Sequence, residues 1–178
     1  MNIEDLKKAA EEIGFEHFGE VNMNALVFQP EVRDMCAANK CAHYGRSWTC
    51  PPGCGTLEDM AEKVKKFSTG LLVQTTVELE DSFDFEAMAE GAQTQKERFN
   101  ALADRLHASE TRCMLMGAGE SCENCAECTY PDAPCRFPDK AQPSMEACGL
   151  NVSQVCGASG VKYYYGPGTL TYTCCVLI

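Results

Sequence analysis

The sequence predicts an α+β or α/β fold: one compact domain over residues 1–178, with a mixed sheet, flanking helices and two cysteine-rich metal-binding loops. Three observations lead to this class. Helical periodicity runs through 85–108, strand-like segments stand at 71–79 and 169–177, and two cysteine clusters occupy segments interrupted by glycine and proline. A chain of 178 residues is also long enough to bury one hydrophobic core.

Three helices are expected from apolar residues spaced three or four apart. The first covers 3–13, with Asn2 as a capping residue. The second begins after Thr56, because Asp59 three residues later completes a capping box. The third covers 85–108 and is the longest in the chain.

Strands are expected where Val, Leu, Thr and aromatic residues gather between turn residues. The last two should form a terminal hairpin around a Gly-Pro-Gly turn. Before them, Ser144 and Asn151 are expected to begin two short helices. The expected strands are 25–28 (closed by Pro30), 71–79, 112–116, 161–165 and 169–177.

Thirteen cysteines are far more than a chain of this size needs for stability. Their number is odd, and the charged opening stretch 1–8 does not resemble a secretory signal, so a disulfide framework is not expected. No apolar run is long enough to cross a bilayer. We therefore expect a cytoplasmic protein, without membrane association, whose thiols bind metal.

The formal net charge of −11 restricts the class of partner. Nucleic acid is not expected, because phosphate backbones need clustered Lys and Arg, and the fifteen in this chain are scattered. An acidic surface suits a basic redox protein, although solubility alone also accounts for such a charge. The oligomeric state cannot be inferred from the sequence.

The second cysteine cluster is the most specific signal. Cys122, Cys125 and Cys128 are three residues apart, a spacing that lets one loop offer thiolates to different irons of a cubane. Cys135 follows as the fourth candidate, at a longer spacing than in bacterial ferredoxins. Zinc is the alternative, but it favours two separate cysteine pairs. The expected cofactor is a [4Fe-4S] cluster.

The first cysteine cluster has a looser spacing, through Cys36, Cys41, Cys50 and Cys54. Glycine and proline interrupt this segment, so a metal would supply the order that regular structure cannot. A second [4Fe-4S] cluster and a zinc ion are both compatible with the spacing. His43 lies among these cysteines and is expected to be a hydrogen-bonding neighbour rather than a ligand.

Other residues near the two clusters could tune a cofactor or act as additional thiols. Arg46, Trp48 and Arg136 are the expected cofactor-binding residues, because such donors and aromatic covers hydrogen-bond a cluster and exclude water. Among the remaining thiols, Cys113 and Cys175 alternate with apolar residues and are expected in the core. The candidates for an extra ligand or a reactive thiol are Cys148 and Cys156.

These residues resemble those of a family described as predicted metal-binding proteins, a domain of unknown function common in anaerobic bacteria and archaea. The resemblance rests on segment 41–52, CAHYGRSWTCPP, on the cysteine run through 122–138, and on 143–147, PSMEA. It covers essentially the whole chain. The resemblance implies metal binding in an anaerobic cytoplasm, and it implies no reaction.

Three functions follow from this reading. The first is an iron–sulfur protein that transfers electrons to or from a partner enzyme. The second is an enzyme whose cluster has an open iron site for a small molecule. The third is a structural zinc-binding protein. No phosphate-binding loop or nucleotide fingerprint is present, and the glycines at 117 and 119 are only weak evidence of one, so the sequence names no substrate.

Overall fold

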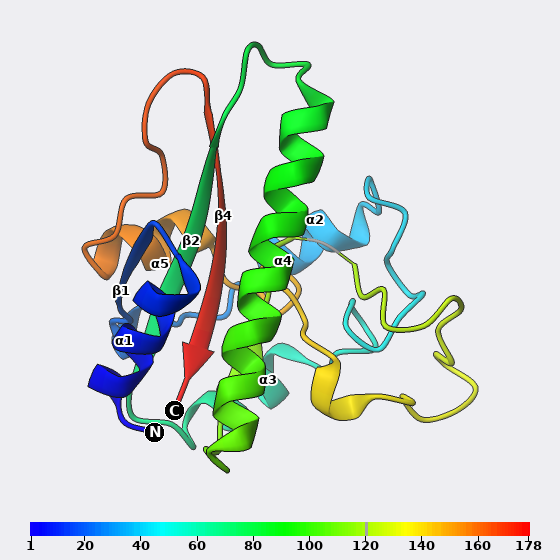
Figure 1. Cartoon of the computed structure of the whole chain (residues 1–178). Coiled ribbons are helices and arrows are strands. Elements are labelled where there is room, and N and C mark those ends of the chain that lie inside the picture. Colours follow the sequence, from blue (N-terminus) through cyan, green and yellow to red (C-terminus); the bar gives the residue numbers. More distant parts are fainter. Residues whose placement is uncertain (120) are drawn as a thin grey trace.

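The computed structural model describes residues 1–119 and 121–178 as helices on both faces of a four-stranded sheet (Figure 1). In chain order the elements are α1 (Ile3–Ile13), β1 (His17–Glu20), the short 3-10 helix η1 (Met23–Ala25), α2 (Pro30–Ala37), α3 (Leu57–Val64), β2 (Gly70–Glu78), α4 (Phe85–Ala108), β3 (Met114–Met116), η2 (Pro138–Lys140), α5 (Val152–Ala158) and β4 (Thr169–Leu177).

The sheet has the strand order β1-β2-β4-β3. Its three ladders are antiparallel, and the long central pair β2 and β4 runs in register from Gly70 opposite Leu177 to Glu78 opposite Thr169. The expected mixed pairing is limited to an isolated parallel bridge between Gly117 and Ser144. The fold is therefore α+β, with helices packed on an antiparallel sheet.

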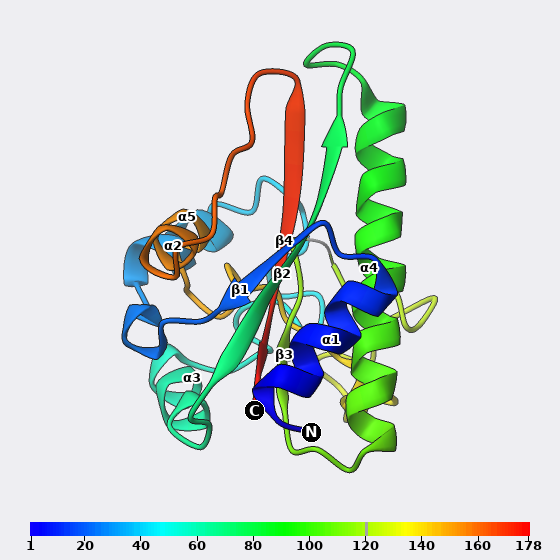
Figure 2. The same cartoon turned by 60° about the vertical axis from the view of Figure 1, so that its left-hand side comes forward.

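Alternating side chains of the central strands divide the core between the two faces of the sheet. On one face, Leu71 and Val176 pack with the apolar residues of α1 and α4. On the other, Leu72 and Cys175 pack with residues of α3 and α5. Figure 2 shows α1 and α4 together on one side of the sheet, with α5, α2 and α3 on the other.

The predicted helix starts are confirmed at three caps. Asn2 and Thr56 each form the predicted kind of cap: the side-chain oxygen accepts from the backbone three residues on, and an aspartate completes the capping box. Asn151 caps α5 in the same way, by accepting from Gln154 N at 3.2 Å. The longest helix, α4, has the predicted bounds. No helix in the described ranges is long and apolar enough to span a membrane.

The region before the first cysteine cluster differs from the prediction. The expected strand at 25–28 does not form: η1 ends at Ala25, and the rest of the segment pairs only through a bridge between Phe28 and Leu150. Pro30 does not close a strand but occupies the first turn of α2, where its fixed φ and missing N–H are tolerated. Helix α2 extends to Ala37, so Cys36 lies in its last turn.

The predicted terminal hairpin is also wrong. Strand β4 pairs with β2 and β3, whereas 161–165 forms no strand. Val161 instead crosses β1 at Gly19, where an added Cβ would lie 2.6 Å from a Val161 methyl. Ser144 accepts from Ala147 N at 3.0 Å but begins a turn rather than a helix. Both differences result from long-range packing, which local patterns do not encode.

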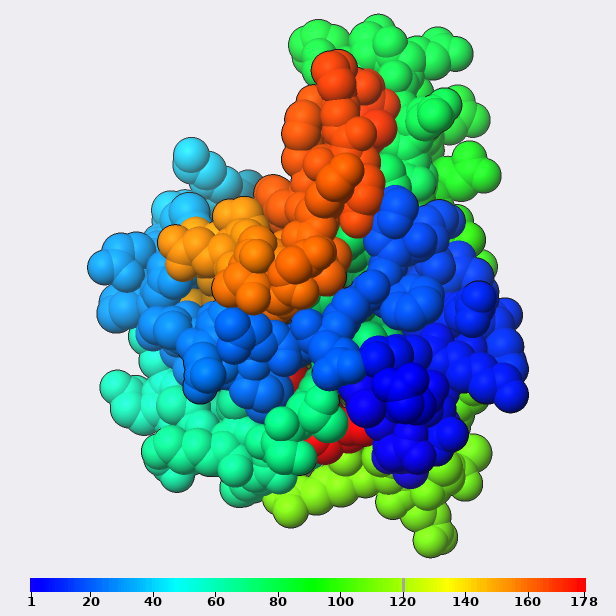
Figure 3. Space-filling model, turned by 90° about the vertical axis from the view of Figure 1, so that its left-hand side faces the viewer, coloured from blue at the N-terminus to red at the C-terminus, as the bar shows by residue number. Residues whose placement is uncertain are grey.

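The two cysteine-rich loops project from the same side of the molecule. In Figure 1 the first loop, in cyan, follows α2, and the second, in yellow, follows β3, and both lie away from β1. The opposite face, shown in Figure 3, contains α1 and β1 in blue and the orange segment that leads into β4. The sheet and its helices thus form a scaffold from which both loops extend.

Candidate metal centres

The four cysteines of the second loop surround one cavity. Cys122, Cys125, Cys128 and Cys135 all line a cavity of about 160 Å³, and each is half-buried. Burial raises the pKa of the Cys122 thiol, and its three cysteine neighbours raise it further because they disfavour a second negative charge. The sequence-predicted ligand set, including the less regular Cys135, is therefore brought together. We call this cavity the second centre.

The first loop supplies part of the wall of the second centre. Arg46 and Trp48 line that cavity, although both are close in sequence to the first cysteine cluster. The Trp48 indole N–H donates to the Ala133 carbonyl at 3.1 Å, and its ring meets that of Tyr130 edge to face at 4.9 Å between centroids. Two loops far apart in sequence therefore enclose one site.

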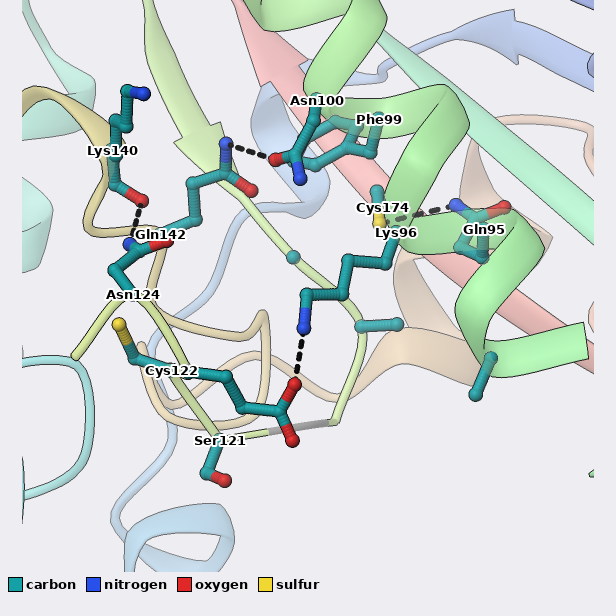
Figure 4. Close-up of a pocket in the computed structure, with 14 residues that line it drawn as sticks. Gln95, Lys96, Phe99, Asn100, Ser121, Cys122, Asn124, Lys140, Gln142 and Cys174 are labelled. Atoms are coloured by element: carbon teal, nitrogen blue, oxygen red, sulfur yellow. Dashed lines mark hydrogen bonds and ion pairs between the residues drawn. The ribbon is translucent and has the colours of Figure 1, made fainter. Parts of the chain in front are cut away.

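Hydrogen bonds hold the second loop in its shape. Arg136, the third predicted cofactor-binding residue, lines the cavity and donates to the Glu127 carbonyl at 2.8 Å. On the other side of Cys122, Glu123 forms an ion pair with Lys96 of α4. Figure 4 shows this side, a smaller cavity of about 70 Å³ between α4 and the loop, with Cys122 among its lining residues. The loop is thus anchored to the scaffold beside its first cysteine.

The first loop lines a second cavity, of about 250 Å³, which we call the first centre. Three of the four predicted cysteines line it: Cys36, Cys41 and Cys50. Glu146 comes to the same cavity from the turn between β3 and α5. Burial raises the pKa of the Glu146 carboxyl, and hydrogen bonds from its own backbone and from Ser144 oppose this shift. Its Oε2 atom is buried and has no hydrogen-bond partner in the part of the chain that the structure describes.

Cys54, the fourth predicted ligand of the first loop, lies outside that cavity. Its side chain is buried, with 8 % exposed, and its thiol donates to the Ala147 carbonyl at 3.4 Å. Burial raises the pKa of the thiol. The structure thus brings together three of the four cysteines predicted for this loop and places the fourth against the backbone.

An arginine that the sequence did not single out stands beside these thiols. Arg33 lies one turn before Cys36 on α2 and donates from Nη1 to the Gly55 carbonyl at 2.9 Å. Its Nε and Nη2 atoms are buried and have no hydrogen-bond partner among the residues that the structure describes. Burial raises the pKa of Cys36, and the Arg33 cation acts in the opposite direction, favouring thiolate.

The two centres share a wall. His43, Thr49 and Ser121 line both cavities. The Thr49 hydroxyl is also within hydrogen-bonding distance of the Ser47 hydroxyl, at 3.2 Å, and both side chains are buried. His43 was expected beside the ligands, and it lies between the two sites. The two centres are therefore neighbours that share three lining residues.

The donor set fits a thiolate-bound, negatively charged cofactor. Partnerless N–H groups on Arg33 could donate to thiolate or sulfide, and burial favours neutral thiols until a metal replaces their protons. Within residues 1–119 and 121–178, no three Cys, His, Asp or Glu side chains already converge as the ligands of one ion. The thiols instead surround the cavities, as they would around a cubane, in which each thiolate binds a different iron.

The remaining cysteines belong to the core rather than to either cavity. Cys175 is buried in β4, as predicted, and Cys113 is half-buried against the core. Cys148 and Cys156 were candidates for extra ligands or reactive thiols, and both are fully buried in the core. Burial raises the pKa of Cys148 to about 12, so its thiol is protonated and unreactive at neutral pH.

Sequence reasoning missed Arg33 and Glu146. Pro30 could have indicated Arg33, because proline favours the first turn of a helix. A helix that begins there places Arg33 and Cys36, three residues apart, on one face. Glu146 lies within the 143–147 segment, but nothing in its local pattern connects it with the first loop. The long-range fold alone places it beside Cys36, whose thiol is 4.0 Å from the Glu146 carbonyl oxygen.

An α+β scaffold with two adjoining, cysteine-lined cavities defines a metal-binding class of protein. The family model described as "Predicted metal-binding protein (DUF2284)" matches residues 19–178. The chain belongs to this family, in agreement with the resemblance of its cysteine motifs. The comparisons with curated proteins and with solved structures found no match.

Proposed function

We propose that this protein binds two iron–sulfur clusters and transfers single electrons to or from a partner enzyme. The observation that carries the proposal is the pair of adjoining cavities, one lined by Cys122, Cys125, Cys128 and Cys135, the other by three cysteines of the first loop. When bound, iron–sulfur clusters supply one-electron redox chemistry.

The protein's own residues supply the environment for this chemistry. Trp48 lines the second centre with its ring packed edge to face on Tyr130, and an aromatic wall limits solvent access, which is one determinant of cluster potential. Arg33 provides positive charge and N–H donors near the first centre. The shared lining residues make the two cavities adjoin, which supports electron transfer through them in series.

A basic redox protein is the proposed partner. The net charge of −11 would attract a positively charged surface over several ångströms and accelerate encounter. A small-molecule enzyme with an open iron site is the second candidate, and the non-cysteine side chain at the first centre favours it. An oxygen-poor cytoplasm would suit either function.

Electron transfer can be tested with a basic c-type cytochrome as acceptor. The protein would be purified without oxygen, reduced with dithionite, freed of excess reductant and mixed with the oxidised cytochrome in a stopped-flow instrument. We expect rapid cytochrome reduction, slowed at least several-fold between 20 mM and 300 mM salt because ions screen the attraction. Failure of the reduced protein to reduce this or a neutral chemical acceptor would contradict the proposal.

A further inference from the structure

The first centre has a ligand set that its cysteine spacing does not suggest. Four cysteines lie in the first loop, but only Cys36, Cys41 and Cys50 line the cavity. Cys54 is buried against the Ala147 carbonyl. Glu146 is the carboxylate that lines the same cavity.

Glu146 is placed as a ligand would be. A Cβ added at Gly119, which lines the same cavity, would lie 3.9 Å from Glu146 Oε1, so the carboxylate borders the cavity. Its Oε2 atom is buried and has no partner among the described residues. A buried carboxylate oxygen without a partner is costly, and binding to a metal ion is one way to compensate for that cost.

No basic side chain of residues 1–119 or 121–178 forms an ion pair with this carboxylate. The nearby Arg33 directs its hydrogen bond to the Gly55 carbonyl. The described residues therefore stabilise the Glu146 carboxylate by hydrogen bonds from its own backbone and Ser144 and not by a cation, which leaves its charge available to a metal. The Ser144 hydroxyl steadies the turn at 144–147 by accepting from Ala147 N.

From these contacts we propose that Glu146, and not Cys54, faces the fourth position of the first centre. This inference rests on the proposed function. The first centre would have three thiolate ligands and one carboxylate ligand. A carboxylate is a harder ligand than a thiolate and binds iron–sulfur iron more weakly, so this position would exchange with a small exogenous ligand. The first centre is thus the site at which a small molecule would reach iron.

The assignment can be tested by comparing two cysteines of the same loop. Cys54→Ser retains a donor for the Ala147 carbonyl, and Cys36→Ser removes a thiol that lines the cavity. We expect Cys54→Ser to retain the full iron and sulfide content of the wild type, purified without oxygen. We expect Cys36→Ser to lose about half of both, with the EPR signal of the second centre unchanged.

Glu146 is tested by spectroscopy. In Glu146→Ala, the first centre should lose one iron on mild oxidation and give the EPR signal of a three-iron cluster, which the wild type should not give under the same treatment. Glu146→Cys should restore resistance to this loss. The second centre serves as an internal control, because its unchanged signal shows that the variant is folded.

The outcomes separate the two proposals. A wild-type protein without iron and sulfide would contradict the proposed function. Wild-type protein with both clusters, but with loss of the first centre in Cys54→Ser, would overturn the assignment of Glu146 alone. The same assignment would be overturned if Glu146→Ala behaved as the wild type does on oxidation.

Discussion

The indole N–H of Trp48 donates to the carbonyl of Ala133 at 3.1 Å, and this hydrogen bond joins two loops that lie 85 residues apart. Each loop contributes cysteines to a different centre, yet Trp48 lines the second centre. The bond therefore couples the shape of one cysteine loop to that of the other. Its removal should affect both stability and the spectrum of the second centre.

Trp48→Phe tests this coupling. The substitution retains an aromatic ring and removes the donor, so we expect a loss of roughly 0.5–1.5 kcal/mol in the free energy of unfolding. We also expect altered g values for the second centre, because its cover changes. Tyr163→Phe is the control, since Tyr163 is 50 % exposed and lines neither cavity. Unchanged melting and EPR in Trp48→Phe would contradict the coupling.

Double substitution of Cys41 and Cys50 by serine should remove one centre only. Both residues line the first centre, so about half of the iron should be lost while the signal of the second centre persists. Cys125→Ala should instead remove the iron of the second centre and leave the signal of the first. It should also destabilise the fold, because metal binding and folding are coupled. Loss of all metal in the double variant would indicate one shared centre, and full retention would show that these thiols are structural.

Gly53 lies where the two loops are in contact, beside Ser47 and Tyr130. An added Cβ would stand 2.4 Å from the Ser47 carbonyl oxygen and 2.9 Å from the Tyr130 ring. Gly53→Ala should therefore cost about 1–3 kcal/mol, as overpacking does. Gly157→Ala is a matched control, because nothing lies within 4 Å of its added Cβ and it sits inside α5. Thermal melting of both variants checks this, and equal melting temperatures would refute close packing at Gly53.

Buried thiols make the protein less stable in alkali. Burial raises the pKa of Cys175 well above 9.0, so the folded state holds this proton more tightly than the unfolded state does. The resulting stability is complete below pH 9 and decreases as pH rises above it. The test is a series of urea titrations of chelator-treated protein from pH 8 to 10.5. Over this range the free energy of unfolding should decrease less for Cys175→Ala than for the wild type.

Val176→Ala is the control for this titration. Val176 is the next residue of β4 and is equally buried, so its truncation should destabilise the fold without changing the slope against pH. The slope of the free energy of unfolding against pH should differ between the wild type and Cys175→Ala by at most about 1.4 kcal/mol per pH unit, the limit for one proton. Equal slopes in the wild type and Cys175→Ala would show that this thiol titrates alike in the folded and unfolded states.

Elements with strong local signals were predictable, and elements fixed by distant contacts were not. The apolar spacing of 85–108 and the caps at Asn2, Thr56 and Asn151 correspond to real helices. Strand β1 was missed, because His17–Glu20 contains a glycine and owes its conformation to pairing with β2.

The same distinction holds for the candidate site. Cys122, Cys125 and Cys128 could be assigned to one site from spacing alone, since one loop delivers all three. Glu146 could not be assigned to the first centre, because it arrives from a turn more than ninety residues after Cys54. Cys54 was predicted together with its three neighbours, but its thiol lies against the Ala147 carbonyl, because proximity in sequence does not decide whether a thiol points into a cavity or against the backbone.

The proposed function requires that both adjoining cavities hold iron–sulfur clusters. The most direct test is the iron, acid-labile sulfide and zinc content of protein purified without oxygen from iron-replete cells. We expect roughly eight iron and eight sulfide per chain, as two cubane clusters require, together with EPR signals on reduction. Protein that contains only zinc under these conditions would contradict the proposed function.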